Sequence, residues 1–349
     1  MTGQEEKCLA KIYTANPEAY QDYLKGRYLW NKRTEEGFIK AIECFQQAIA
    51  RDASYALAYC GVADCYSLLA NYGFCHPKEG FSRANEAALK ALEIDDTLCE
   101  AHVSLAFIKS DYAWDWSGAE KEFQRAIALN PSNAIAHQWH GYVLWKTGQF
   151  EVSIAEHKRA LVLDPLSLAV NRNLGLAFFL ARQYDLAIEQ LGKTLEMDPG
   201  FVLTRDYLGL AYAKNGLYEE GLAECEKAAA MIPVSPYALS ALGYVYAVCG
   251  KKTDAQNVLA RLNELSEQKY VSSRFVASIF AGLSENDKAF KSLSAAYEDR
   301  SLEIGPGIKA DPTYDSLRSD PRFLDLLRRI GLENENYSHP GNPGARTSA

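Results

Sequence analysis

One helical string recurs at a nearly fixed interval along this chain of 349 residues. The starts of its successive copies are 43, 35, 34, 34, 34, 34 and 34 residues apart. A period of this length predicts a stack of supersecondary units, each burying its apolar face against its neighbours. The repeat therefore constrains the fold before any single element is assigned. The copies begin at Ala41, Ala84, Ala119, Ser153, Ala187, Gly221, Ala255 and Ala289.

A second string precedes each copy in the regular part of the chain, so each unit reads as a pair of helices. Glycine falls in the middle of the first helix, where it costs about 1 kcal/mol relative to alanine. We therefore expect another helix to pack closely there, through small residues of its own. The glycines are Gly141, Gly175, Gly209 and Gly243, and the expected small residues opposite are Ala160, Thr194 and Ala228.

Glycine and proline also mark the predicted ends of these helices. A glycine with positive φ is expected to end the first helix of a unit, and a proline to stop the second. The repeat is thus marked by the same residue types at the same positions, and not only by its length. The glycines are Gly148, Gly216 and Gly250, and the prolines are Pro131, Pro165, Pro199 and Pro233.

A 34-residue helix-turn-helix unit with these small residues resembles the tetratricopeptide repeat. Eight units cover about residues 17–301, of which the first two are irregular. The first unit has the long turn NKRTEEG, and the second has an insertion near 70–84, around Tyr72 to Phe81, whose role the sequence leaves open. The resemblance implies an all-α, right-handed superhelical solenoid of about eight repeats with a C-terminal capping helix.

The repeat is flanked by segments of different character. Residues 1–16 form a lead segment, and after Ser301 the period fails at Gly305, Pro306, Gly307 and Pro312. Within residues 302–332 the string DPRFLDLLRRIGL reads as an amphipathic capping helix after a linker. Residues 333–349 contain almost no apolar side chains, so we expect a disordered tail.

The resemblance also indicates a candidate binding surface, because the first helices line the concave groove of the family. Large aromatic rings with a few Arg and Lys groups are typical of peptide-binding hot spots. In an all-helical protein an aromatic at helical spacing can equally be a core residue, so contact and packing remain open for each position. The candidate groove residues are Phe107, Gln138, Tyr142, Trp145, Lys146, Arg172, Leu176, Phe179, Asp206, Leu210, Lys214, Tyr237 and Tyr244.

Composition and charge narrow the classes of partner. The chain carries 37 basic and 45 acidic residues, a formal net charge of -8, and so has no overall positive field for nucleic acid. The apolar run from Ala238 to Cys249 is too short for the roughly 20 residues that span a bilayer. Eight cysteines without a C-x-x-C pair indicate a reducing compartment, so a cytoplasmic location is predicted.

Catalytic and metal motifs are weak. His137 and His140 lie three residues apart, as do Cys99 and His102, but neither pair has a nearby third ligand in the sequence. Cys75 and His76 sit together in the insertion without an orienting third group. No phosphate-binding glycine loop or nucleophile motif occurs. We therefore predict a non-catalytic protein with no metal and no cofactor.

Three segments outside the generic repeat carry a narrower resemblance, and they point to two functional hypotheses. In a bacterial subgroup, similar repeat arrays form the C-terminal part of signalling proteins that carry a Ser/Thr kinase or a winged-helix regulator domain. The leading hypothesis is a protein-interaction scaffold that binds a peptide or helix of a partner in its groove. The alternative is a regulatory or sensing module whose effector domain is absent from this chain. The oligomeric state is not indicated. The segments begin at Thr2, Asp111 and Tyr314.

Overall fold

The computed structural model describes residues 14–303, 305 and 307–333. Within these residues the chain consists of helices and turns, with no strand, so the predicted all-α solenoid is confirmed. Pro306, most of the predicted lead segment and nearly all of the predicted tail lie outside the described residues. No described helix combines the length and the apolar character needed to cross a membrane.

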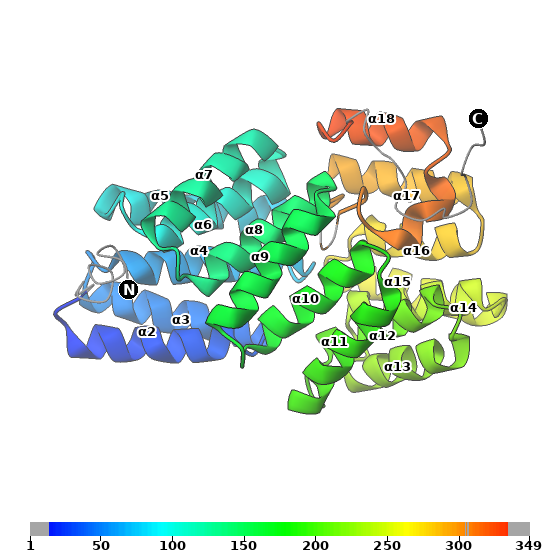
Figure 1. Cartoon of the computed structure of the whole chain (residues 1–349), viewed down its shortest axis with the longest axis horizontal. Helices are drawn as coiled ribbons and strands as arrows, with labels where there is room; N and C mark the ends of the chain where they lie inside the picture. The colour runs from blue at the N-terminus through cyan, green and yellow to red at the C-terminus, as the bar shows by residue number, and fades with distance from the viewer. Residues whose placement is uncertain (1–13, 304, 306, 334–349) are drawn as a thin grey trace, which may run out of the picture.

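Sixteen helices form eight consecutive antiparallel pairs, which stack in chain order from α2 to α17 (Figure 1). The pairs are α2 (Pro17–Trp30) with α3 (Glu35–Arg51), α4 (Ala56–Asn71) with α5 (Pro77–Ile94), α6 (Cys99–Ile108) with α7 (Trp116–Leu129), α8 (Ala134–Thr147) with α9 (Phe150–Leu163), α10 (Leu168–Leu180) with α11 (Tyr184–Met197), α12 (Leu203–Lys214) with α13 (Tyr218–Met231), α14 (Pro236–Val248) with α15 (Lys252–Ser266), and α16 (Ser273–Gly282) with α17 (Asn286–Glu298). The main core is a long cluster of apolar side chains between the pairs, and two smaller clusters lie near the first units and at the C-terminal cap.

The helix ends follow the predicted chemistry. Gly148, Gly216 and Gly250 have φ values of 89, 83 and 77°, which only glycine adopts without strain. In the fifth unit Arg182 takes the same position with φ of 61°. The extra residues of the second unit do not form a large loop, because they lengthen α5 to 18 residues. Pro77 starts this helix, where its missing N–H costs nothing.

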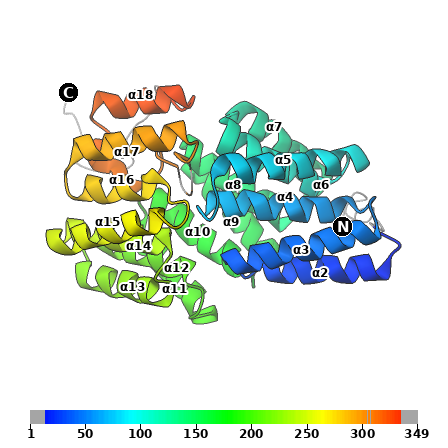
Figure 2. The ribbon, with the colours of Figure 1, turned by 180° about the vertical axis from the view of Figure 1, so that it is seen from behind.

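The stack of repeats curves until its two ends meet, as seen from behind in Figure 2. The Tyr237 hydroxyl of α14 donates to the carbonyl of Asn71, at the end of α4, over 3.2 Å. His76 and Tyr270 bring their ring centroids to 5.1 Å. Residues of the second and seventh units therefore touch, although more than 160 residues separate Asn71 from Tyr237.

After α17 the chain turns back into the molecule before it ends in the capping helix. The 3-10 helix η2 (Pro312–Leu317) is followed by α18 (Pro321–Arg329), which lies beside α17 (Figure 1). Phe323, Leu326 and Leu327 of α18 are buried in a second apolar cluster. The Trp116 indole also donates to the carbonyl of Ile330 over 2.7 Å, so the cap contacts the third unit as well as the last.

Two glycines on neighbouring helices allow the packing within a unit to be tested with one and the same substitution. A Cβ on Gly209 would lie 2.4 Å from Cys225 Sγ and 2.9 Å from the Gly221 carbonyl oxygen, whereas a Cβ on Gly192 would meet nothing within 4 Å. We expect Gly209→Ala to destabilise the fold by about 1–3 kcal/mol through overpacking. Gly192→Ala should stabilise it by about 0.5–1 kcal/mol through helix propensity. Urea denaturation of both variants would measure this, and equal shifts would contradict the register.

Candidate functional site

The thirteen predicted groove residues all lie on first helices of their units, from α6 to α14. Eleven of them are buried, and only Lys214 and Tyr237 are partly exposed. Nine line two small internal cavities that meet at Tyr207 and Tyr237. The cavities hold about 40 and 30 Å³, room for a few water molecules each. The predicted groove residues thus share one inner surface, but most of that surface is closed to solvent. The nine residues are Phe107, Gln138, Tyr142, Arg172, Leu176, Asp206, Leu210, Tyr237 and Tyr244.

The other four predicted residues do not line these cavities. Trp145 is fully buried and stacks on His157 with ring centroids 5.0 Å apart, so it packs between helices. Phe179 is likewise fully buried beside Tyr207. The Lys214 ammonium lies over the ring of Tyr244, and burial lowers the pKa of this lysine.

The described residues of the chain's own segment 301–317, called here the strap, lie against the groove. Groove side chains hold its main chain. Lys146 Nζ donates to the Glu303 carbonyl over 2.5 Å, and the Tyr142 hydroxyl donates to the Gly305 carbonyl over 2.5 Å. Arg182 donates to the Ala310 carbonyl over 2.7 Å. All three contacts are made to main-chain carbonyl groups of the strap, whose described residues form turns and the 3-10 helix η2.

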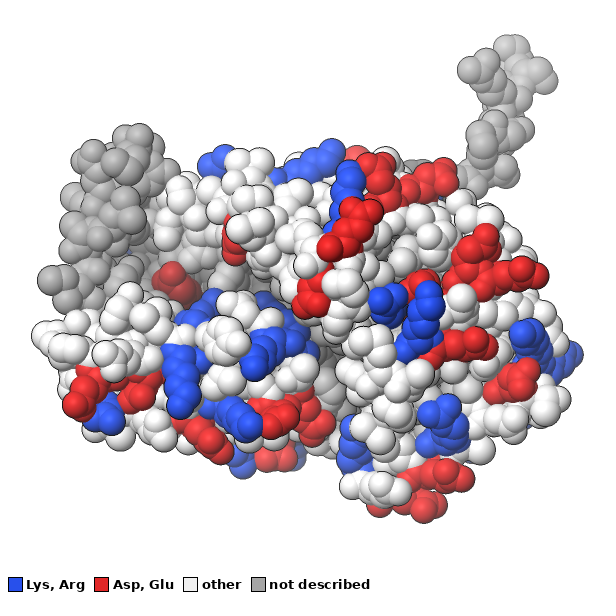
Figure 3. Space-filling view, turned by 90° about the horizontal axis from the view of Figure 1, so that it is seen from below, with Lys and Arg blue, Asp and Glu red and all other residues white. Residues whose placement is uncertain are grey.

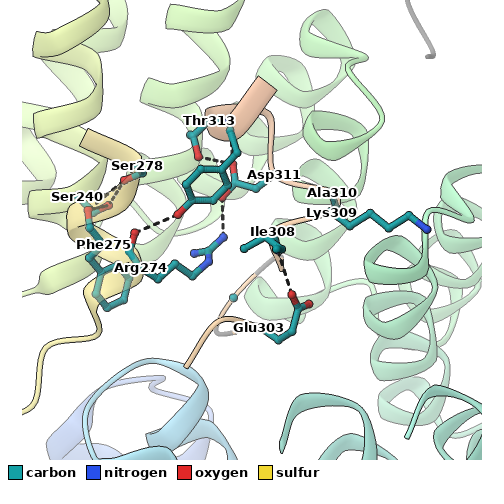
Figure 4. Close-up of polar contacts among 12 residues, drawn as sticks. Ser240, Arg274, Phe275, Ser278, Glu303, Ile308, Lys309, Ala310, Asp311 and Thr313 are labelled. Carbon is teal, nitrogen blue, oxygen red and sulfur yellow. Dashed lines mark hydrogen bonds and ion pairs between the residues drawn. The ribbon is translucent and has the colours of Figure 1, made fainter. Parts of the chain in front are cut away.

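A buried ion pair anchors the middle of the strap (Figure 4). Arg274 of α16 donates to Asp311 over 2.7 Å, and both side chains are less than a tenth exposed. The Thr313 amide and hydroxyl donate to the other oxygen of Asp311, over 2.9 and 2.8 Å. The Tyr314 hydroxyl donates to the Arg274 carbonyl over 3.0 Å. Asp311 therefore has partners on both oxygens, which a buried carboxylate requires.

Apolar side chains complete the hold on the strap. Five are fully buried: Leu302, Ile308, Ala310, Tyr314 and Leu317. The glycines and prolines of this segment lie outside the 34-residue period and so predict a linker before the capping helix. The structure buries this linker inside the molecule, which the irregular spacing of its apolar residues does not indicate.

A second buried charge, the ammonium of Lys146, lies where the strap enters the groove. Besides the strap carbonyl, Lys146 contacts Asp111 over 2.9 Å, and Asn71 donates to the same carboxylate over 2.7 Å. Burial raises the pKa of Asp111, while the charge of Lys146 opposes the rise. Burial also raises the pKa of Glu303. The groove thus neutralises one cation with several acceptors.

The histidines singled out in the sequence have structural partners. His137 contacts Glu156 over 2.6 Å and the Pro131 carbonyl over 2.9 Å. His102 makes the same two kinds of contact one unit earlier, with Glu122 and the Asp96 carbonyl. Arg205 repeats them two units later, with Glu224 and the Pro199 carbonyl. The residue at this repeat position therefore links the loop before its own helix, through a carbonyl, to the second helix of the unit, through a glutamate.

His140 is paired in a different way. Burial lowers its pKa, but hydrogen bonds to Glu120 and Glu156 outweigh burial and raise the pKa to about 9. The Glu120 carboxylate lies 2.9 Å from the ring. Among the described residues, no group of three or more His, Cys, Asp or Glu side chains is arranged to hold a metal ion.

The fold and the groove define an α-solenoid built from stacked helix hairpins, with a turn-rich segment of the same chain held against its inner face. A family model of the tetratricopeptide repeat matches residues 112–167, 139–200 and 172–236. The matched part of the chain, residues 112–236, therefore consists of tetratricopeptide repeats.

Comparisons with known proteins agree at the level of fold. The transcriptional regulator HilA of Salmonella typhimurium is 26% identical over 132 residues, which are 38% of this chain and 24% of HilA. The chain thus matches about a quarter of the length of the curated relatives. The human IFIT1 dimer with PPP-AAAA superposes with a TM-score of 0.61 at 16% identity, over 89% of this chain and 72% of IFIT1. A monomeric IFIT1 mutant with m7Gppp-AAAA gives 0.63 at 15% identity, over 93% and 74%.

The buried carboxyl of Asp206 makes the stability of the groove depend on pH. Burial raises its pKa from 3.8 to about 7, against the opposing charge of Arg172, and its Oδ1 atom has no hydrogen-bond partner among the residues that the structure describes. A raised pKa means that the folded state holds this proton more tightly than the unfolded state. The stability that this proton contributes is therefore lost as the pH rises through 7.

Asp206→Asn keeps the shape of the side chain without its charge. We expect the stability of this variant, relative to the parent, to be greater at pH 8 than at pH 5. Urea denaturation of both proteins at the two pH values measures the difference. If the two proteins changed in parallel with pH, Asp206 would not be the group responsible.

Proposed function

We propose that this chain is a non-catalytic protein-interaction scaffold whose concave groove holds an extended segment of a partner protein. The observation that carries the proposal is the grip on the strap. Lys146, Tyr142 and Arg182 each donate to a strap carbonyl. Such main-chain contacts tolerate many side chains, so a partner segment could occupy the same path.

Binding in the groove would require exchange with the strap. The cavities beside the strap have room for water molecules but not for a second peptide. A tethered segment competes at a high effective concentration, about millimolar for a short flexible tether. A partner would therefore have to bind tightly or engage a second surface as well.

A protein ligand fits the charge of the chain better than nucleic acid does. IFIT1 carries RNA-like ligands in the structures named above, but only the fold is shared. This chain has a formal net charge of -8, and on the face seen in Figure 3 acidic and basic side chains are interspersed.

The seven described cysteines are free thiols, which supports a reducing, cytoplasmic setting.

A second candidate function is that of a regulatory or sensing module in a bacterial signalling system. It is favoured by the similarity to HilA, a transcriptional regulator, over part of its length. In this role the repeat array would position an effector kinase or DNA-binding domain. Co-purification of such an effector with the chain from native cells would support this function, and its absence from repeated pull-downs would count against it.

The groove can be tested with its own strap as the probe. Asp311→Asn with Tyr314→Phe weakens the anchor without changing a groove side chain, so the strap should leave the groove more often. We expect a fluorescent peptide of residues 301–317 to bind this double variant at least about tenfold more tightly than the parent, as measured by anisotropy.

Asp325→Asn, on the exposed side of the capping helix, serves as the control and should bind like the parent. Circular dichroism would confirm that each variant remains helical. A helical double variant that gained no affinity for the peptide would refute binding in the groove.

A further inference from the structure

The larger of the two internal cavities has an unusual charge balance. Two arginines line it, together with three side-chain amides and several tyrosines, while no Asp or Glu is among the described residues around it. Both arginines are more than nine-tenths buried. The described residues around this cavity thus offer donors and positive charge but no carboxylate; the carboxyl of Asp206, which interacts with the charge of Arg172, lies in the neighbouring cavity. The arginines are Arg33 and Arg172, and the amides are Asn71, Gln138 and Asn173.

Arg33 has no charged partner. Its guanidinium carbon lies 3.5 Å from the Trp30 ring centroid, but the side chain makes no hydrogen bond or ion pair with the described part of the chain. Burial lowers its pKa from 12.5 to about 10. Arg33 also has a φ of 55°, an uncommon conformation for a residue other than glycine. The turn between α2 and α3 therefore holds a buried cation in a fixed place.

The neighbouring acidic group is already engaged. Asp64 accepts a hydrogen bond from Ser104 over 2.6 Å and pairs with Arg27 at 3.4 Å. Arg172 donates from Nε to the Leu203 carbonyl and from Nη1 to Asn173, but its Nη2 has no acceptor within the described residues. Leaving a buried charge unpaired is costly, so the pair of guanidiniums favours an external anion.

A surface groove lies next to this cavity, lined by apolar side chains and, at its rim, by three lysines and three glutamates. Arg33 and Phe201 line both spaces. The outer groove encloses about 680 Å³, which is the size of a typical small-molecule site. Figure 3 shows the face on which a hollow separates the N-terminal and C-terminal halves. The apolar side chains of the groove come from α3, the turn after α4, the start of α12 with the loop before it, and the loop before α14: Ile39, Phe74, Val202, Leu203, Ile232 and Val234.

We propose that Arg33 and Arg172 bind the carboxylate or phosphate head of a small amphiphilic anion, whose apolar part lies in the outer groove. This site borders the strap, because Tyr142 and Gly305 also line the cavity, but the two arginines donate to no strap carbonyl that the structure describes, and the inference does not depend on the proposed peptide binding. The net charge of the chain is negative, so anions are not collected by the protein as a whole. Recognition would rest on these two side chains and on the apolar groove.

The proposal can be tested by calorimetric titration of the full chain with octanoate, octyl phosphate and octanol. We expect saturable binding of octanoate or octyl phosphate, and the tighter of the two identifies the head group. Octanol should bind at least about tenfold more weakly, because it lacks the charge. Equal binding of octanol, or no binding of either anion below millimolar concentration, would overturn the proposal.

Arg33→Asn removes the cation while asparagine tolerates a positive φ, and we expect it to weaken binding of the anion at least about tenfold. Arg300→Asn is the matched control, because Arg300 also has positive φ, 62°, and lies over a tryptophan ring, that of Trp114. It should bind as the parent does. Arg33→Lys keeps a charge and should retain part of the affinity if Arg33→Asn proves unfolded by circular dichroism. Unchanged affinity in a folded Arg33→Asn variant would refute the site.

Discussion

The inner face of this solenoid is polar and aromatic, and it can be buried only if its donors and charges find partners. The strap supplies several of them. Its carbonyls accept from Lys146, Tyr142 and Arg182, and Asp311 neutralises Arg274. A buried donor or cation left alone would cost on the order of 1–3 kcal/mol or more. The strap and the groove therefore stabilise each other, and neither surface would remain as it is without the other.

The repeat and its chemical register could be predicted from the sequence, because they depend on local spacing. Gly148 ends its helix with positive φ, as the pattern indicates. Gly209 also packs closely on the second helix of its unit, but the residue that it meets is Cys225 and not the predicted Ala228; in the same way Gly141 meets His157 and Gly175 meets Leu191, in place of Ala160 and Thr194. The strap could not be predicted in the same way. Its contacts join residues far apart, such as Arg182 with Ala310 and Lys146 with Glu303, and no periodic signal records them.

The candidate groove residues show the same division. Their helices and their inward direction follow from the repeat, so nine of the thirteen line the internal cavities. Their exposure depends on the strap and on the meeting of the two ends, which are tertiary events. Arg33 was missed because it lies in the irregular first unit, on a turn rather than on a first helix.

The meeting of the two ends changes how such a solenoid carries mechanical load. An open repeat array extends like a spring, because each unit contacts only its neighbours. Here Tyr237 bonds to Asn71, and Trp116 bonds to Ile330 beside the cap. These latches oppose stretching and couple the first units to the last. Tension applied to the ends of the chain would meet a stiff body until the latches break, and the protein would then lengthen abruptly rather than gradually.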